Sequence, residues 1–325
     1  MSQPAFTTTT TAEEVATAFA DQIKGKNVLI TGTSINGIGF EAARVVARYA
    51  NLVIITGYNA ERLKLSVETI KKEIPSANVR PLTLDLTSLA SVRQAAAEVN
   101  EYTEPLHVLI HNAASAPGKY QLTVDHLETQ MAVDHISPFL FTKLLVPKLL
   151  AAATPSYTPR VVYVSSAAHL FGTGVDLNTV AKGNPETYTL MGRYSEVKSA
   201  TILTATELSK RSKGKINAYS LHPGAIHTNM NQKEDAIGPL QKVGLLDENG
   251  LPKKNSQFEW KTIPQGAATT LVAAFNPALD AIPGAYLSDC VDATAQRAPH
   301  TSDPGTASKL WKITEEIIGE EFAFE

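Results

Sequence analysis

The chain has 325 residues, of which 43% are hydrophobic and 19% charged, as is ordinary for a globular protein. Its 29 basic and 32 acidic residues give a formal net charge of −3, so no basic excess indicates nucleic acid or an anionic membrane as a partner. The single cysteine, Cys290, excludes an internal disulfide framework and metal clusters built on cysteine, and it suits a reducing compartment.

No apolar run approaches the length of a membrane span, so no membrane anchor is expected. Residues 1–11 are polar and rich in threonine, without the basic and apolar parts of a signal peptide. We therefore expect a cytoplasmic protein in which residues 1–11 are disordered and residues 12–23 form a short helix.

The rest of the chain alternates between short apolar runs and longer amphipathic segments. An apolar run at 27–31 is typical of a buried parallel strand, and it leads into a glycine-containing turn at 32–39 and a helix at 40–49. Further strands are predicted at 52–56, 79–85, 106–110, 160–165 and 216–220. Further helices are predicted at 60–72, 89–99, 124–150 and 193–211. This alternation predicts an α/β fold, a Rossmann-type doubly wound parallel sheet with helices on both faces.

No linker rich in Pro, Gly or Ser divides the chain, so a single domain at 24–325 is expected after the tail and short helix at 1–23. The stretches at about 171–193 and 229–262 are expected to be insertions at the C-terminal edge of the sheet, where open α/β sheets bind ligands. Apolar residues of the second insertion either line a substrate pocket or pin the insertion to the body, and we favour the pocket. They are Leu240, Val243, Leu245, Leu246, Phe258 and Trp260.

The turn at 32–39 has the strand–turn–helix context in which a glycine-rich motif predicts dinucleotide binding. Gly32, Gly37 and Gly39 permit a tight turn and let a diphosphate approach the backbone, while the following helix offers free N–H groups and the positive end of its dipole. The alternative is an ordinary strand-to-helix turn that contains glycine.

Tyr194 and Lys198 are four residues apart in a predicted helix, so their side chains share one face. A free phenol has a pKa of about 10, and a nearby ammonium favours the phenolate, which makes a phenol a usable general acid/base near neutral pH. The pair alone is a weak signal, because an ordinary amphipathic helix also contains such spacings.

Taken together, the motifs stand in a specific order along the chain. The sequence resembles the classical short-chain dehydrogenase/reductase superfamily from about residue 24 to residue 319. Within it, the chain resembles the branch of retinol-dehydrogenase-like and WW-domain-oxidoreductase-like enzymes. The superfamily resemblance is carried by Thr31-Gly32, Gly37-Ile38-Gly39, Asp85, Asn112-Ala113-Ala114, Ser165-Ser166, Tyr194, Lys198, His222-Pro223-Gly224 and Thr228. The branch is indicated by Ser165-Ser166-Ala167-Ala168-His169, by residues 284–290, and by Asp303-Pro304 with Leu310-Trp311.

The resemblance implies an NAD(P)-dependent oxidoreductase that moves a hydride between nicotinamide and a carbonyl or alcohol substrate. It implies that Tyr194 transfers the proton, that Lys198 assists it and holds the nicotinamide ribose, and that Ser166 hydrogen-bonds the reacting oxygen. Ser165 is expected to be structural. Asp85 either bonds the adenine edge or only caps Thr87.

The other positions matched to the cofactor are taken from the glycine turn, the end of the second strand, the fourth strand and the Pro-Gly segment. They are Gly32, Thr33, Ser34, Asn36, Gly37, Ile38, Gly39, Tyr58, Asn59, Arg62, Leu86, Asn112, Ala113, Ala114, Pro223, Gly224, Ile226 and Thr228. Within this set Asn112 is expected beside the adenine ribose.

Three positions depart from the family pattern. Four residues instead of three separate Gly32 from Gly37, so the turn must bulge, with Asn36 a candidate for a left-handed conformation. Ala114 stands where the family has glycine. Asp134 stands where the family has an asparagine that holds a proton-relay water, and it either anchors that water or is a structural substitution.

No acidic residue that would select NAD follows the second strand, which ends in Thr56-Gly57-Tyr58-Asn59. The family's NADP-binding arginine would fall at Tyr58. Arg62 and Lys64 open the next helix, and Thr33, Ser34 and Asn59 offer hydrogen bonds to a phosphate. NADP(H) is therefore the favoured cofactor and NAD(H) the alternative.

Two other function classes are alternatives to an NAD(P)-dependent oxidoreductase. One is a catalytically silent NADP(H)-binding redox sensor, against which the intact Ser166, Tyr194 and Lys198 argue. The other is a lyase or epimerase, which usually carries a longer C-terminal substrate domain. No metal is predicted, because the spacing of His107, His126, His169 and His222 is unlike that of metal ligands. The family resemblance implies a homodimer or homotetramer, paired through the 124–150 helix and the helix that holds Tyr194. Leucines of the 124–150 helix either form an apolar outer face or simply pack on the sheet. They are Leu140, Leu144, Leu145 and Leu149.

Overall fold

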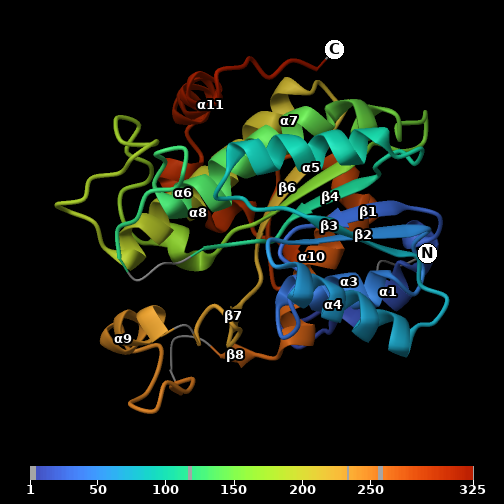
Figure 1. Cartoon of the computed structure of the whole chain (residues 1–325), viewed down its shortest axis with the longest axis horizontal. Helices are drawn as coiled ribbons and strands as arrows, with labels where there is room; N and C mark the ends of the chain where they lie inside the picture. The colour runs from blue at the N-terminus through green and yellow to red at the C-terminus, as the bar shows by residue number, and fades with distance from the viewer. Residues whose placement is uncertain (1–4, 116–118, 233, 255–258, 325) are drawn as a thin grey trace.

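The computed structural model describes residues 5–115, 119–232, 234–254 and 259–324. One eight-stranded sheet crosses the molecule in the order β3-β2-β1-β4-β5-β6-β9-β10, and its neighbouring strands are parallel except for the final pair (Figure 1). The strand order reverses beside β1, which places a ligand crevice at the carboxyl ends of β1 and β4. The strands are β1 (Asn27–Ile30), β2 (Leu52–Gly57), β3 (Val79–Thr83), β4 (Val108–His111), β5 (Arg160–Val164), β6 (Asn217–His222), β9 (Tyr286–Ser288) and β10 (Val291–Asp292).

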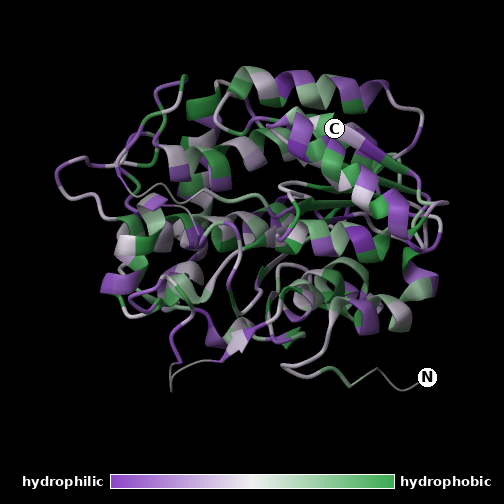
Figure 2. Ribbon diagram, turned by 60° about the horizontal axis from the view of Figure 1, so that its bottom comes forward, coloured by the Kyte–Doolittle hydropathy of each residue, from purple (hydrophilic) through white to green (hydrophobic). Residues whose placement is uncertain are grey.

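Helices cover both faces of the sheet, as the alternation predicted (Figure 1). All four residues of β1 and of β4 are buried, which explains why these strands read as continuous apolar runs. Figure 2 shows hydrophobic residues gathered on the strands and hydrophilic residues on the outer turns of the helices. One layer contains α1 (Ala12–Ala18), α3 (Ile38–Val46), α4 (Ala60–Glu73) and α10 (Ile263–Phe275). The other contains α5 (Leu89–Glu101), α7 (Ser137–Leu150), α8 (Leu190–Arg211) and α11 (Pro304–Ile318).

The N-terminal segment is more ordered than the sequence predicted. Of the lead predicted to be disordered, residues 1–4 lie outside the described residues, and a turn at 7–10 is closed by a hydrogen bond from the Thr10 N–H to the Thr7 carbonyl. Thr11 caps α1 in a reciprocal capping box with Glu14. The predicted helix at 12–23 is divided at Phe19 into α1 and α2 (Ala20–Ile23). The ring of Phe6 packs edge-on against that of Phe19, at 5.6 Å between centroids, so this segment joins the core beneath α10.

The helix predicted at 124–150 begins later and is not uniform. Residues 124–128 form a turn in which His126 has a φ of 60°, and Glu128 accepts hydrogen bonds from the backbone N–H groups of Gln130 and Met131. The helix then passes through α6 (Thr129–Met131) and a π-helical turn, η1 (Ala132–Ile136), into α7. A π turn carries one extra residue per turn, a feature often found at functional sites.

Of the two alternatives for the leucines of the 124–150 helix, packing within the subunit is the one that the structure shows. Leu140, Leu145 and Leu149 are fully buried, because α7 packs its leucines against the sheet and neighbouring helices. Leu144 is only partly buried and also packs against this core.

The second insertion lies at one end of the sheet, apart from the two helical layers (Figure 1). It contains α9 (Glu234–Lys242) and β8 (Trp260–Lys261), which pairs with β7 (Ala225–Ile226). The first insertion follows the 3-10 helix η2 (Ala167–Leu170) and consists of turns up to α8. Three further 3-10 helices are η3 (Pro277–Ala281), η4 (Thr294–Gln296) and η5 (Pro299–Thr301). Within the described ranges, every helix is too short or too polar to cross a membrane.

Candidate active site

The glycine turn adopts the bulged conformation expected from its extra residue. Asn36 has a φ of 63°, the left-handed region that asparagine tolerates, and this confirms the expected bulge. A Cβ on Gly39 would lie 2.3 Å from the side-chain nitrogen of Asn112, and one on Gly32 would lie 2.7 Å from the backbone of Ala113. Only glycine therefore allows the turn to pack against the segment that follows β4.

The N-terminus of α3 opens directly from this turn. Gly37 is its N-cap, and no side chain caps the helix, so the first backbone N–H groups are left for a ligand. Such a helix start favours an anionic group. The glycine cradle and the uncapped helix together fit a dinucleotide diphosphate.

The Asn112 side chain forms hydrogen bonds that were not expected from the sequence. Its side-chain nitrogen donates to the backbone carbonyls of Thr31 and Gly32, at 3.0 Å each, while the Thr31 hydroxyl accepts from the N–H groups of Asn112 and Ala113. These bonds brace the glycine turn against β4. The contact between Asn112 and an adenine ribose stays a prediction.

A single cavity of about 540 Å³ lies along the carboxyl edge of the sheet and brings most of the expected residues together. Thr33 and Asn59 line an adjoining small pocket instead, Asn36 is exposed, and Gly39 is buried beneath Asn112. Asp134 lies behind Lys198. The expected residues that line the cavity are Gly32, Ser34, Gly37, Ile38, Tyr58, Arg62, Asp85, Leu86, Asn112, Ala113, Ala114, Ser166, Tyr194, Lys198, Pro223, Gly224, Ile226 and Thr228.

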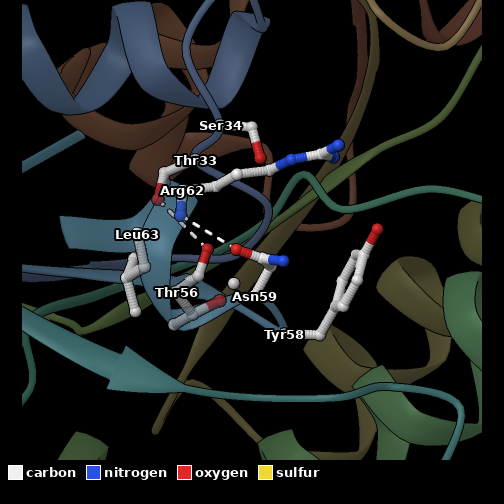
Figure 3. Close-up of a pocket in the computed structure, with 8 residues that line it drawn as sticks. Thr33, Ser34, Thr56, Tyr58, Asn59, Arg62 and Leu63 are labelled. Atoms are coloured by element: carbon white, nitrogen blue, oxygen red, sulfur yellow. Dashed lines mark hydrogen bonds between the residues drawn. The ribbon is translucent and has the colours of Figure 1, made fainter. Parts of the chain in front are cut away.

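The end of the cavity nearest β2 is shown in Figure 3, where Ser34 and Arg62 lie together and the Tyr58 ring lies opposite them. The Asn59 side chain caps α4 by accepting from the backbone N–H of Arg62 at 2.9 Å, so its oxygen is already used. The Thr33 hydroxyl donates to the carbonyl of Thr56 at 3.1 Å. Of the groups expected to meet a phosphate, Ser34 and Arg62 therefore remain in place to do so.

Asp85 follows β3 and lines the same cavity. One of its carboxylate oxygens accepts from both the backbone N–H and the hydroxyl of Thr87, at 2.9 and 2.7 Å. The capping interpretation is therefore confirmed, and the bond to an adenine edge stays a prediction.

Helix α8 presents Tyr194 and Lys198 on one face, as their spacing predicted. Thr189 caps this helix, and the Lys198 ammonium lies 5.2 Å from the centre of the Tyr194 ring. The ammonium also donates to the Val164 carbonyl at 3.2 Å and forms an ion pair with Asp134 at 2.9 Å. Asp134 thus contacts Lys198 directly.

The electrostatics of this pair follow from its burial. Burial opposes the charged form of Lys198, but the Asp134 carboxylate and the phenolate form of Tyr194 hold the pKa of the ammonium above its ordinary value. Burial raises the pKa of Asp134, although Lys198 and the Ser115 N–H favour the carboxylate. Lys198 and Asp134 thus form a buried ion pair, with the ammonium nitrogen and a carboxylate oxygen 2.9 Å apart.

The two serines after β5 have separate roles. Ser165 is buried and its hydroxyl donates to the Lys198 carbonyl at 2.7 Å, in keeping with a structural task. Ser166 caps η2, its hydroxyl oxygen accepting from the Ala168 N–H at 3.1 Å, so its own proton is available as a donor toward the cavity.

Burial lowers the pKa of His222 to about 4, and the neutral ring accepts from the Ala167 N–H at 3.1 Å, which stabilises the start of η2.

Sequence reasoning missed the buried contact that joins α8 to the start of α6. Arg193, directly before Tyr194, donates to Glu128 at 2.8 Å, to Glu196 at 2.7 Å and to the carbonyl of Val180 at 2.8 Å. The side chains of Arg193 and Glu128 are 4% and 0% exposed. Because these partners lie far apart in sequence, no local pattern indicated the contact.

Part of the second insertion closes the cavity with apolar side chains. Leu240, Leu245 and Trp260 line it, as expected for a pocket. Leu246 packs with Ala236 and pins the insertion, Val243 is 52% exposed, and Phe258 lies outside the described residues. Phe171, Leu190 and Met191 are among the lining residues that were not expected from the sequence. In the described part of the chain, no group of three or more His, Cys, Asp or Glu residues is arranged to hold a metal.

Comparison with known proteins agrees with this geometry. A family model described as short chain dehydrogenase matches residues 26–237. The chain belongs to the short-chain dehydrogenase/reductase family, in the branch that includes retinol dehydrogenase 12 and the WW domain-containing oxidoreductase. It is accordingly an oxidoreductase of the NAD(P)(H)-dependent class.

Several curated relatives align along nearly the whole chain. The chain is 34% identical to short-chain dehydrogenase TIC 32 B, chloroplastic, from Brassica napus, over 95% of this chain and 92% of the relative. It is 32% identical to short-chain dehydrogenase/reductase prx1 from Penicillium rubens, over 92% and 86%. It is 31% identical to retinol dehydrogenase 12 from Bos taurus, over 92% and 88%.

Solved structures share the fold. A protein of uncharacterised function from Mycobacterium paratuberculosis matches with a TM-score of 0.68 and 28% identity, over 93% of this chain and 98% of that one. A short chain dehydrogenase from Escherichia coli CFT073, solved in complex with NADPH, matches with a TM-score of 0.61 and 21% identity, over 83% and 98%.

Proposed function

We propose that the protein interconverts a carbonyl compound and the corresponding alcohol, using NADP(H). The observation that carries this proposal is the convergence of the Tyr194 phenol and the Ser166 hydroxyl on one cavity, with the Lys198 ammonium beside the phenol ring. The bound nicotinamide supplies or accepts the hydride. The chain supplies the proton and the position of the reacting oxygen.

Each of these side chains has a distinct part. In the direction of reduction, Ser166 donates a hydrogen bond to the carbonyl oxygen, and the phenol O–H of Tyr194 breaks as its proton passes to that oxygen. The phenolate that remains regains a proton from solvent. The Lys198 ammonium stabilises the phenolate and would hold the nicotinamide ribose of a bound cofactor, while Asp85 and the glycine turn would hold its adenosine and diphosphate ends.

The proposed substrate is apolar and mid-sized, because the insertion lines its end of the cavity with Leu240, Leu245 and Trp260. The test is the consumption of NADPH with panels of ketones and aldehydes, and the reduction of NADP with the alcohols. We expect steady turnover with apolar members. A silent redox sensor remains the competing function, and it would bind the cofactor without turning over any member of either panel.

The preference for NADP(H) rests on Arg62. Its side chain lines the cavity beside Ser34 at the end where the adenine ribose is expected (Figure 3). Lys64, the other basic candidate, instead lies 3.9 Å from Glu68 on an exposed face of α4. A 2′-phosphate beside Arg62 would form a charge-assisted hydrogen bond, and the segment at the end of β2, residues 56–59, contains no carboxylate to repel it.

Replacing Arg62 with Ala should weaken NADPH binding about ten- to a hundredfold and leave NADH binding nearly unchanged, because a hydrogen bond to a charged group contributes about 1.5–3 kcal/mol. Dissociation constants measured by nicotinamide fluorescence for both cofactors test this. Lys64→Ala is the matched control and should bind both cofactors as the parent does. Equal loss of NADH and NADPH affinity in Arg62→Ala, or a parent that prefers NADH, would contradict the preference.

We also propose that the chain forms a homodimer or homotetramer, as members of this family usually do. The support is family membership, because the leucines of α7 are occupied within the subunit. Light scattering at micromolar concentration should give two or four times the 34.9 kDa mass of the chain. A monomeric mass under these conditions would refute the proposal.

A further inference from the structure

The surroundings of Lys198 differ from those that an asparagine at position 134 would provide. An ammonium has three N–H donors. The Lys198 ammonium donates one of them to the Val164 carbonyl at 3.2 Å, and it forms an ion pair with the Asp134 carboxylate at 2.9 Å, while the side chain also borders the cavity. The side chains of Lys198 and Asp134 are 3% and 1% exposed, so water screens their interaction poorly.

The carboxylate is held in this position from its other side. The second oxygen of Asp134 accepts from the backbone N–H of Ser115 at 2.8 Å, directly after the Asn112–Ala114 segment. The π turn η1 aims Asp134 between this backbone and Lys198. Lysine and aspartate together carry no net charge, whereas lysine with a neutral amide would place a full positive charge beside the phenol.

We propose that Asp134 is a positioning residue that offsets the charge of Lys198 and thereby keeps the Tyr194 phenol protonated at neutral pH, the form that serves carbonyl reduction. This inference rests on the proposed function and adds a direction to it. A protonated phenol can donate to the reacting oxygen at once, whereas oxidation of an alcohol requires the phenolate. The site is therefore built to work as a reductase near neutral pH and as a dehydrogenase only at higher pH.

The other charged groups around this centre are already paired or neutral. Arg193 pairs with Glu128 and Glu196, and Glu128 is the nearest further acid that acts on Asp134. Burial lowers the pKa of His135 to about 3, so this neighbour of Asp134 is neutral at physiological pH. His222, on β6, is neutral for the same reason. Removing the carboxylate of Asp134 is thus the change that leaves Lys198 uncompensated.

The first test needs neither cofactor nor substrate. The ultraviolet absorbance of phenolate is followed against pH for the parent and for Tyr194→Phe, and the difference isolates Tyr194 from the other tyrosines. We expect the parent to show little Tyr194 phenolate at neutral pH. In Asp134→Asn, measured against Asp134→Asn/Tyr194→Phe, phenolate should form at a pH lower by about one unit or more, because an unpaired cation lies close to the phenol.

The second test follows turnover. In Asp134→Asn, the pH at which carbonyl reduction falls to half and the pH at which alcohol oxidation rises to half should both move in the acid direction by a similar amount. Glu207→Gln is the matched control, because Glu207 is also a buried acid, which lies on α8 and pairs with Arg211 instead of Lys198. Its titration and rate profiles should coincide with those of the parent.

Specific results would overturn the inference. A parent whose Tyr194 is already phenolate at neutral pH contradicts it, and this measurement holds even if Asp134→Asn fails to fold. A folded Asp134→Asn whose phenolate forms at the parental pH, or at a higher pH, also contradicts it. The failure of the proposed function appears separately, as a parent with no turnover, because the phenolate titration is made on the free protein.

Discussion

Replacing Tyr194 with Phe should slow carbonyl reduction at least about a hundredfold, because loss of a positioned acid typically costs about 10²–10⁴-fold in rate. The substitution removes one oxygen and keeps the ring, so the fold and the cofactor site should persist. Lys198, the glycine turn and the uncapped start of α3 all remain in place to hold the dinucleotide. NADPH consumption under saturating substrate, together with the dissociation constant for NADPH, measures the two effects separately.

Two companion variants sharpen this experiment. Tyr120→Phe removes another tyrosine hydroxyl, one that donates to the Lys182 carbonyl at 2.9 Å outside the cavity, and it should keep the parental rate. Lys198→Ala should lose both turnover and cofactor affinity, because this lysine acts on the phenol and on the ribose. If Tyr194→Phe turns over substrate at a rate similar to the parent, the phenol is not the acid and the mechanism is wrong.

Replacing Arg193 with Met should lower the free energy of unfolding by about 3–5 kcal/mol, the usual consequence of removing one partner from a buried ion pair. Glu128 is fully buried and would be left with only backbone N–H donors beside it. The loss should appear as a lower midpoint of denaturant unfolding. It should also reach the active site, since Arg193 precedes Tyr194 and holds the 179–180 backbone at its side.

The control for Arg193→Met is an ion pair at the surface. Lys64→Met breaks the exposed contact with Glu68 and should change stability by less than about 1 kcal/mol. The double variant Glu128→Gln/Arg193→Met should recover part of the loss, because it leaves no unpaired buried charge. An Arg193→Met protein as stable as the parent would show that the buried contact contributes nothing to folding.

The parts of the fold that could be predicted from sequence are those that depend on residues close together along the chain. The continuous apolar runs of β1 and β4 predicted buried strands of a parallel sheet. The extra residue in the glycine turn predicted the left-handed conformation of Asn36. The spacing of Tyr194 and Lys198 gave their common face on α8. In each case neighbours along the chain fix the conformation, so one segment of sequence suffices.

The parts that could not be predicted depend on contacts between distant segments. The ion pair of Asp134 with Lys198 and the contact of Arg193 with Glu128 join residues that are 64 and 65 positions apart in the sequence. No local periodicity indicates such contacts. The sequence left two alternatives for the leucines of α7, because an apolar helix stripe looks the same whether it meets a sheet or another subunit. Only the tertiary arrangement separates these alternatives.

The π turn η1 offers a route by which the charge in this active site could change during evolution. Each residue of an α-helix advances the chain by about 100° around the axis, so one extra residue in a turn offsets the two halves of the helix by that angle. This helical phase lets Asp134 face Lys198 while Leu140 and Leu145 on α7 face the core. Gaining or losing a single residue in η1 would therefore alter the charge beside the phenol, as replacing Asp134 would, while leaving Ser166, Tyr194 and Lys198 unchanged.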